Sequence, residues 1–133
     1  MQSALSCQPE QQLRTVLIVN DEPDMTDALR YLLEHGGFAV ELAGNGLEAL
    51  SKLRGGLHPC LIVLDVRMPI MDGFEFRQRQ LSDPDLAGIP TIVLSAAIDD
   101  RGDTPARLRA NAYLEGVFDL DGLLDLVRKH SLR

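Results

Sequence analysis

The sequence predicts an α/β fold: a doubly wound, five-stranded parallel sheet in the order 2-1-3-4-5, with helices on both faces. Three apolar runs, at 15–19, 61–64 and 89–94, are short and end at polar or turn residues, as strands buried on both faces do. Amphipathic helical segments alternate with these runs, and such alternation favours a parallel sheet. Two weaker runs, at 38–43 and 112–114, suit the edges of that sheet, which gives the order stated.

Length and composition indicate one globular domain. A chain of 133 residues is long enough for a single core, and we expect a flexible tail over 1–13 and one domain over 14–133. The net charge is −7, from 13 basic and 20 acidic residues, and the lack of a basic stripe argues against nucleic-acid binding by this chain. No apolar run approaches the ~20 residues that span a membrane, and the polar N-terminus does not have the layout of a secretion signal. We therefore expect a cytoplasmic protein.

The cysteines and histidines predict neither a disulfide framework nor a zinc site. Cys7 and Cys60 lie far apart in the sequence and form no CxxC motif, and the three histidines fall in separate segments. No His/Cys pair therefore has the spacing of zinc ligands. Cys60, at the start of a strand, is expected to be a small buried residue.

The first half of the chain is predicted to form a strand, an acidic turn and a helix, then an edge strand and a second helix. Pro23 follows the acidic turn and suits the first turn of a helix, which Gly36 and Gly37 end. The apolar side of that helix is expected to comprise Met25, Ala28, Leu29, Leu32 and Leu33. Asn45 and Glu48 have the spacing of a capping box for the second helix. Its apolar side is expected to comprise Leu47, Leu50 and Leu53.

The second half begins with the apolar strand that ends at Asp65. Asp72 has N-cap spacing to Glu75 and is expected to start the next helix, in which Arg77 and Arg79 face solvent. The apolar side of this helix is expected to comprise Phe74, Phe76 and Leu81. A short helix is expected over 105–111, and the last helix has Leu120, Leu123, Leu124 and Val127 on its apolar side. Positive charge in the last turn of that helix suits the helix dipole.

Polar residues stand at the ends of three predicted strands, at one edge of the sheet. Asn20 and Asp21 follow the first strand, Asp65 ends the third, and Ser95 ends the fourth. In the order 2-1-3-4-5 they meet at the switch point, where open α/β folds keep their sites. Two carboxylates that close repel unless a cation compensates them, and a hard divalent cation such as Mg²⁺ is suited to that, with Glu22 as a further candidate ligand. A carboxylate can also attack phosphorus to give an aspartyl phosphate, and the Ser95 hydroxyl would stabilise the transferring oxygens.

Three segments together resemble the receiver domain of response regulators in two-component signalling. They are 16–22, 64–73 and 93–96, and the resemblance extends from about residue 14 to the C-terminus. It implies a flavodoxin-like receiver fold in which Asp65 accepts a phosphoryl group from a histidine kinase or a phosphotransfer protein. It also implies a signalling phosphoacceptor rather than an enzyme, with self-catalysed phosphotransfer and autodephosphorylation at most. We expect a monomer, with a dimer as the alternative, that contacts neither nucleic acid nor membrane.

The resemblance assigns roles to the neighbours of the phosphoacceptor. Asp21, the phosphoacceptor carboxylate and the backbone carbonyl of Arg67 would hold Mg²⁺. Asn20, where the family usually has a carboxylate, would reach the ion through a water molecule. Ser95 would be the switch hydroxyl, and Tyr113 would turn inward as the coupled aromatic residue. The output face would lie around the fourth helix, the fifth strand and the fifth helix.

Two departures from the family follow the fifth strand. Gly116 stands where similar domains have the lysine that contacts the phosphoryl group, and Val117 stands where they have proline. A cis peptide before a residue other than proline costs about 2.5–4 kcal/mol, so we expect this bond to be trans. The only lysines, Lys52 and Lys129, fall on helices that we place away from the site. Arg67 is left with two interpretations, as a substitute positive charge or as a solvated loop residue.

Three alternatives to a phosphorylated receiver remain. A pseudo-receiver would have the same fold and act as a protein-interaction module without phosphorylation. A phosphatase of the haloacid-dehalogenase type would need a second aspartate two residues after the nucleophile, where Arg67 stands. A flavodoxin would need a Ser/Thr-rich phosphate loop after the first strand, where Asp21 and Glu22 would repel phosphate. The sequence leaves open whether the domain stands alone or was cut from a longer protein.

Overall fold

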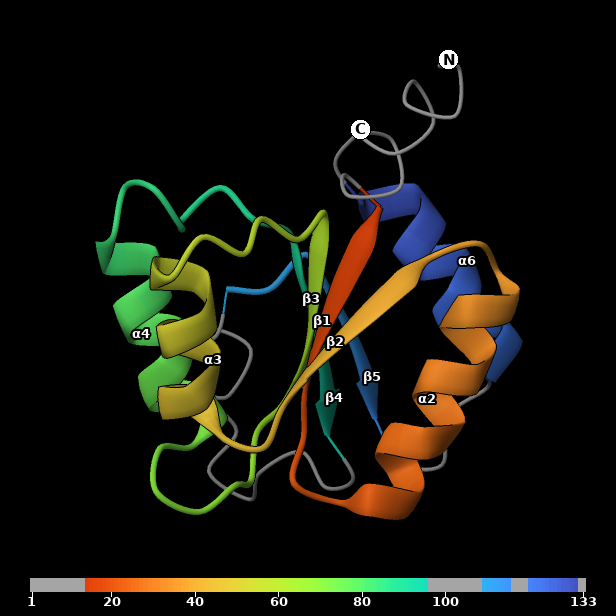
Figure 1. Cartoon of the computed structure of the whole chain (residues 1–133), viewed down its shortest axis with the longest axis horizontal. Helices are drawn as coiled ribbons and strands as arrows, with labels where there is room; N and C mark the ends of the chain where they lie inside the picture. Colours follow the sequence, from red (N-terminus) through yellow and green to blue (C-terminus); the bar gives the residue numbers. More distant parts are fainter. Residues whose placement is uncertain (1–13, 96–108, 116–119, 132–133) are drawn as a thin grey trace.

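The computed structural model describes residues 14–95, 109–115 and 120–131, and its elements alternate between strand and helix (Figure 1). In chain order they are β1 (Thr15–Val19), α2 (Pro23–His35), β2 (Ala39–Ala43), α3 (Gly46–Arg54), β3 (Leu61–Asp65), α4 (Gly73–Ser82), β4 (Thr91–Ser95), β5 (Ala112–Glu115) and α6 (Leu120–His130). None of the helices in these ranges combines the length and the apolar composition that crossing a membrane requires.

Some expectations fall outside the described residues. These are the N-terminal tail over 1–13, the trans peptide between Gly116 and Val117, and most of the short helix expected over 105–111. The described part of that helix, residues 109–111, is not helical and leads directly into β5.

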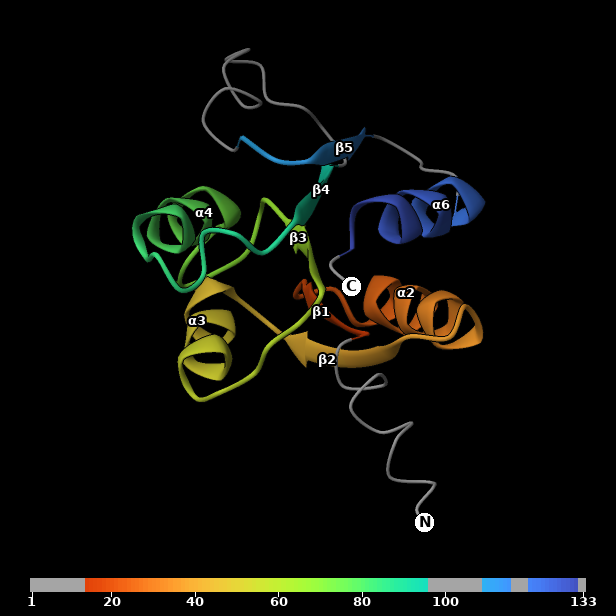
Figure 2. The ribbon, with the colours of Figure 1, turned by 90° about the horizontal axis from the view of Figure 1, so that it is seen from above.

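The five strands form one parallel sheet in the order β2-β1-β3-β4-β5, which confirms the predicted order. Helices α3 and α4 cover one face of the sheet, and α2 and α6 cover the other (Figure 2). The strands β1 and β3 lie side by side at the centre, with Val19 paired to Leu64. Their carboxyl ends therefore meet at one edge of the molecule.

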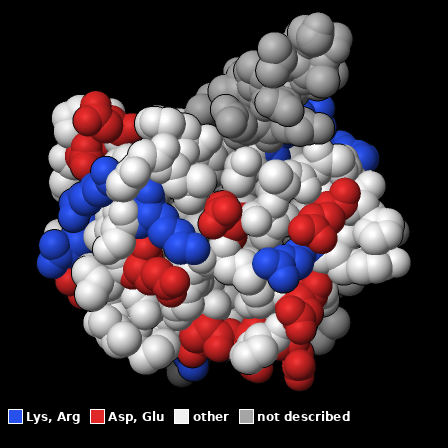
Figure 3. All heavy atoms as spheres, viewed as in Figure 1, with Lys and Arg blue, Asp and Glu red and all other residues white. Residues whose placement is uncertain are grey.

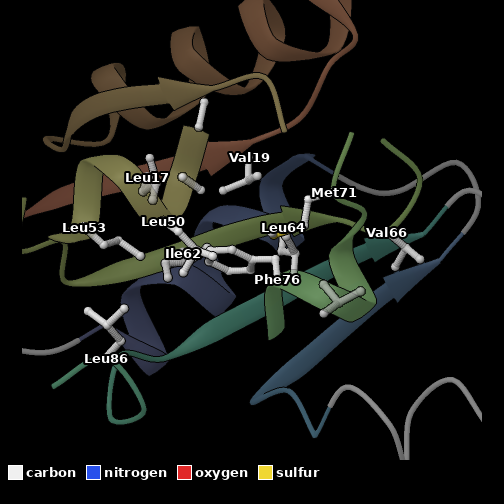
Figure 4. Packing of buried hydrophobic residues seen from close by; sticks show 13 residues of the cluster. Leu17, Val19, Leu50, Leu53, Ile62, Leu64, Val66, Met71, Phe76 and Leu86 are labelled. Carbon is white, nitrogen blue, oxygen red and sulfur yellow. The ribbon is translucent and has the colours of Figure 1, made fainter. Parts of the chain in front are cut away.

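Alternate residues of the central strands pack into two separate cores, one on each face. The core under α3 and α4 contains Leu17, Ile62 and Val93 from the sheet, together with Leu50 and Phe76 from the helices. Figure 4 shows the Phe76 ring lying among Ile62, Leu64 and Leu50. The core under α2 and α6 contains Val16, Ile18, Leu61, Val63, Ile92 and Leu94 from the sheet, with Leu29, Leu33, Leu123 and Val127 from the helices. A strand that contributes to both cores must be apolar at every position, which is the pattern in the sequence.

Strand β2 confirms the expected edge character. Its side chains alternate between exposed and half-buried along Ala39–Leu42, and it pairs only with β1 among the described strands. Cys60 is 3% exposed in the core under α2 and α6, as expected for a small buried residue, and burial raises the pKa of its thiol.

The helix caps follow the predicted spacing. The Asn45 side chain accepts a hydrogen bond from the Glu48 N–H at 2.9 Å, and Glu48 Oε1 accepts one from the Gly44 N–H at 2.7 Å. The Asp72 side chain accepts a hydrogen bond from the Glu75 N–H at 2.9 Å. The Asn45 and Asp72 side chains thus accept from backbone N–H groups that the first turn of a helix leaves without partners.

Three expectations about helix faces were wrong. Ala28 is exposed, because the buried side of α2 is formed by Thr26, Leu29 and Leu33. Leu47 is 51% exposed, because the buried side of α3 is formed by Ala49, Leu50 and Leu53. Arg77 is only 3% exposed and does not face solvent, whereas Arg79 is exposed and forms an ion pair with Glu75. The buried positions of α4 follow helical spacing, but two of the four, Arg77 and Gln80, are polar. The apolar periodicity of this helix is therefore weak although its buried face is regular.

Candidate functional site

Asn20 and Asp65 lie beside one another at the ends of β1 and β3. Asn20 is 9% exposed, and its N–H donates to the Ala43 carbonyl of β2 at 2.9 Å. Its side-chain oxygen Oδ1 accepts a hydrogen bond from the Glu22 N–H at 2.8 Å. The Asn20 side chain therefore shapes the turn into α2. The hydrogen bond from Glu22 uses one of the two lone pairs of its amide oxygen.

Asp65 is half-buried, and its environment opposes ionisation. Burial raises the pKa of the Asp65 carboxyl above its ordinary value, and the negative charge of Asp21 raises it further. Hydrogen bonds from the backbone N–H groups of Arg67 and Val66, and the positive charge of Arg67, act in the opposite direction. The structure thus brings Asp21 and Asp65 within electrostatic reach of one another. Such a pair calls for a positive charge.

The rim of this site carries further negative charge. Asp21, Glu22 and Asp24 are exposed at the turn into α2. Figure 3 shows acidic side chains gathered along the lower edge of the molecule, where β1 and β3 end in Figure 1. In the described part of the chain, no group of three or more His, Cys, Asp and Glu side chains is placed to hold a metal ion. The candidate magnesium site therefore rests on the two carboxylates that the sequence predicted.

Two glycines hold the loop after Asp65 close to the site. The Gly73 N–H donates to the Val66 carbonyl at 2.8 Å, and a Cβ on Gly73 would lie 2.6 Å from the Asp65 carbonyl oxygen. The Gly46 N–H donates to the Met71 carbonyl at 2.9 Å, and a Cβ there would lie 2.8 Å from Met71 Cγ. The role of Gly46 was missed by sequence reasoning, because its neighbour in space is 25 positions away along the chain.

Ile70 lies in an unfavourable backbone conformation in the same loop. Its φ is 70°, and the Met71 N–H donates to the Pro69 carbonyl at 2.7 Å across it, which makes a three-residue turn. Positive φ is rare for β-branched residues because Cβ crowds the backbone. The Ile70 side chain is 77% exposed, so little packing offsets this strain.

The predicted switch residues lie on the two strands beyond β3. Asp65 pairs with Leu94 of β4, so the backbone of Ser95 is one position further toward the site edge. Tyr113 pairs with Val93 and packs, half-buried, against the core under α3 and α4. Its hydroxyl accepts a hydrogen bond from the Ala110 N–H at 2.9 Å. Tyr113 is thus bound toward the start of β5 in this structure.

The two lysines occupy positions away from Asp65. Lys52 Nζ donates to the Leu42 carbonyl of β2 at 2.6 Å and lies 3.5 Å from Glu41, with β1 standing between β2 and β3. Lys129 is exposed in the last turn of α6. Among the residues that the structure describes, Arg67 supplies positive charge that acts on Asp65, and its side chain is exposed.

A cavity of about 830 Å³ lies elsewhere, on the outer side of α3 and α4. It is lined mainly by polar side chains of these helices and of the segment after α4, with Asp72 among them, and includes neither Asp21 nor Asp65. The cavity is therefore distinct from the carboxylate pair.

Comparisons with known proteins agree with this geometry. A family model described as "Response regulator receiver domain" matches residues 16–128. A 14.6 kDa uncharacterized protein from the sodA1 3′ region of Leptolyngbya boryana is 42% identical over 119 residues, covering 88% of this chain and 89% of that protein. The response regulator Rre1 of Synechocystis is 35% identical over 120 residues, covering 86% of this chain, which spans 50% of the length of Rre1. The receiver domain of a signal transduction histidine kinase from Syntrophus aciditrophicus superposes with a TM-score of 0.78 at 33% identity, covering 86% of this chain and 87% of that one.

Proposed function

This chain belongs to the response-regulator receiver domain family, and from that premise we propose that it accepts a phosphoryl group on Asp65 in a two-component phosphorelay. One observation carries the proposal: the half-buried Asp65 carboxyl ends a central strand within electrostatic reach of Asp21, which follows the adjacent strand β1. Because Asp65 is only half-buried, its carboxylate is accessible to a phosphoryl donor. The charges of Asp21 and Arg67, which already act on this carboxylate, would also act on the charge that a phosphoryl group adds.

The transfer is a displacement at phosphorus. A carboxylate oxygen of Asp65 attacks the phosphorus of a phosphohistidine on a histidine kinase or a phosphotransfer protein. The new O–P bond forms as the P–N bond breaks, and its electron pair returns to the imidazole nitrogen. The N–H groups of Val66 and Arg67 favour the ionised, nucleophilic carboxylate, and the Arg67 guanidinium adds positive charge nearby. The chain would then act as a phosphoacceptor that catalyses at most its own phosphorylation and dephosphorylation.

The residues present fit a magnesium ion. The negative charge of Asp21 makes ionisation of Asp65 more costly, and two such neighbouring carboxylates are the kind of donor set that a hard divalent cation prefers. Asp21, Asp65 and the backbone carbonyl of Arg67 would hold the ion, which would supply positive charge beside the transferring phosphoryl oxygens. Asn20 Oδ1 already accepts one hydrogen bond and has one lone pair left for a bound water. Ser95 and Tyr113 would complete the switch.

A second candidate function, a pseudo-receiver that binds a partner without phosphorylation, is favoured by the positions of the lysines. Gly116 has no side chain to contact a phosphoryl group, and Lys52 is bound to the Leu42 carbonyl on an edge strand. Without such a cation, transfer to Asp65 depends more heavily on Arg67 and on the metal.

Intact mass separates the two candidates. The natural protein is incubated with Mg²⁺ and either acetyl phosphate or phosphoramidate, beside Asp65→Ala and the control Asp85→Ala, which removes an exposed carboxylate outside the site. We expect a gain of one phosphoryl group in the natural protein and in the control, and none in Asp65→Ala. No gain from either donor in the natural protein would favour the pseudo-receiver.

A further inference from the structure

A buried polar network joins α4 to β4. Arg77 is 3% exposed, and Gln80 and Thr91 are fully buried. Arg77 Nη1 donates to Gln80 Oε1 at 2.8 Å and to Thr91 Oγ1 at 3.0 Å. Gln80 Nε2 in turn donates to the backbone carbonyls of Leu86 and Ile89, both at 3.1 Å. A guanidinium removed from water is tolerated only where its N–H groups find acceptors, so this network fixes the direction of the Arg77 side chain.

The same guanidinium reaches the backbone that leads into β5. Arg77 Nη2 donates to the Arg109 carbonyl at 2.8 Å, and the Ala110 N–H donates to the Tyr113 hydroxyl at 2.9 Å. That carbonyl and that N–H are the two polar ends of one peptide group, so Arg77 and Tyr113 hold the group from opposite sides. A hydrogen bond at one end polarises the peptide and strengthens the bond at the other end. Burial lowers the pKa of the Arg77 guanidinium and Tyr113 partly offsets that effect, which places the two side chains within electrostatic reach.

The backbone at this point needs to be held. Arg109 has a φ of 49°, in the left-handed region that residues other than glycine rarely adopt. The next anchor follows at once, because the Asn111 N–H donates to the Thr91 carbonyl and Asn111 Oδ1 accepts from the Thr91 N–H, each at 2.9 Å. Among the described residues, Asn111 is thus held by β4, whereas the hydrogen bonds to the Arg109–Ala110 peptide come from Arg77 and Tyr113.

We propose that Arg77 is a positioning residue for Tyr113: through the Arg109–Ala110 peptide it holds the Tyr113 hydroxyl in the place seen here. We call the two hydrogen bonds to this peptide, from Arg77 and to Tyr113, the brace, and the brace opens when the aromatic ring moves. The opening step rests on the proposed function, in which phosphorylation of Asp65 moves Tyr113. The brace itself exists in the unphosphorylated protein and is tested there.

Hydrogen exchange of the Ala110 amide, measured by NMR on the unphosphorylated protein, tests the brace. Tyr113→Phe removes the acceptor, and we expect exchange about fivefold faster, as for the loss of one ordinary hydrogen bond. Arg77→Met is expected to accelerate exchange by about the same factor in the natural protein, but by less than about twofold in the Tyr113→Phe background. Equal acceleration in both backgrounds would mean that the two residues act independently and would overturn the proposal. The control Arg79→Met, on the exposed side of the same helix, should leave the rate unchanged.

A loss of the whole fold is distinguished by the amide of Ile18, a fully buried residue of the interior strand β1, which we expect to exchange only on global opening. If Arg77→Met also accelerates exchange of the Ile18 amide, Arg77→Lys is used as the test variant instead. The lysine ammonium keeps the positive charge but lacks the two guanidinium nitrogens that reach Thr91 and Arg109 together. Faster exchange at Ala110 with Ile18 unchanged supports the brace. An unchanged Ala110 rate in Arg77→Lys overturns it.

The link to signalling is read on the natural protein after acetyl phosphate and Mg²⁺, with intact mass recorded on the same sample. In phosphorylated protein we expect the Ala110 amide to exchange at the rate found for Tyr113→Phe. Phosphorylated protein with the original Ala110 rate would overturn the opening of the brace. An absence of phosphorylation would overturn the proposed function alone, since the comparison of unphosphorylated variants decides the brace independently.

Discussion

At the scale of single residues, the Asp65 carboxyl is subject to opposing influences on its pKa. Burial and the charge of Asp21 raise its pKa, while two backbone N–H groups and Arg67 restrain that rise. When the pKa of an acid is higher in the folded state than in the unfolded state, the folded protein binds more protons at any pH between these two pKa values. Stability therefore falls as the pH rises through that interval, which begins near the ordinary carboxyl value of about 3.9.

We expect Asp65→Asn to remove this pH dependence. The free energy of unfolding of the variant should exceed that of the natural protein at neutral pH by up to about 1 kcal/mol, since solvent screens a half-exposed carboxyl. The difference should shrink on acidification below the ordinary carboxyl pKa. Urea unfolding without divalent cations, at a series of pH values, measures it. A constant difference, or the same trend in Asp85→Asn, would contradict this explanation.

Ile70 gives a second prediction at the residue scale. Asparagine tolerates positive φ better than a β-branched residue, so Ile70→Asn should raise the free energy of unfolding by about 1 kcal/mol. Urea unfolding is again the measurement. Leu47→Asn is the matched control, because it also removes an exposed apolar side chain but from a helix. A gain of the same size in the control would assign the effect to hydrophobicity rather than to the backbone.

At the scale of elements, the loop between β3 and α4 is positioned by close backbone contacts. Gly73 lies against the Asp65 carbonyl where the two ends of the loop meet, and Gly46 lies against Met71 within the loop. The same loop carries the Val66 and Arg67 N–H groups that act on the Asp65 carboxyl, so these contacts support the environment of Asp65.

Gly73→Ala should therefore disturb both stability and the site. Its Cβ would meet backbone atoms of Asp65 and Val66 at 2.6 and 2.8 Å, and we expect a loss of about 2–3 kcal/mol in the free energy of unfolding. Phosphorylation by acetyl phosphate, followed by intact mass, should slow in parallel. Gly88→Ala is the control, because its added Cβ would have no described atom within 4 Å apart from those of its own chain neighbours. A Gly73→Ala protein with natural stability would show that this loop is not closely packed.

At the scale of the whole molecule, the site bridges two central strands of one cooperative sheet. A cation bound by Asp21 on the β1 side and Asp65 on β3, as proposed above, would stabilise the folded state in proportion to the logarithm of its concentration. We expect millimolar Mg²⁺ to raise the thermal midpoint of the natural protein by a few degrees, since about 1 kcal/mol corresponds to roughly 4 °C at this size. The rise should be absent in Asp65→Asn and smaller in Asp21→Asn. An equal rise in all three proteins would assign the effect to general screening.

The sheet order and the carboxylate pair were predictable from the sequence because they depend on local signals. Apolar runs at 15–19 and 61–64 mark strands buried on both faces, the weaker alternation at Glu41 marks an edge, and parallel connection then brings Asp21 and Asp65 together. The burial of Arg77 was not predictable, because its acceptors come from β4 and from residue 109, which lies 32 positions along the chain.

The edge strand β2 has a consequence for how copies of this protein behave at high concentration. An open sheet edge offers backbone groups to which an extended chain can add, and proteins discourage this with charge placed beside the edge. Here Glu41 projects from β2, and Lys52 is bonded to the Leu42 carbonyl of the same strand. Together with the net charge of −7, this ion pair disfavours sheet-to-sheet aggregation, so Lys52, which takes no part in the phosphoryl chemistry proposed above, contributes to colloidal stability.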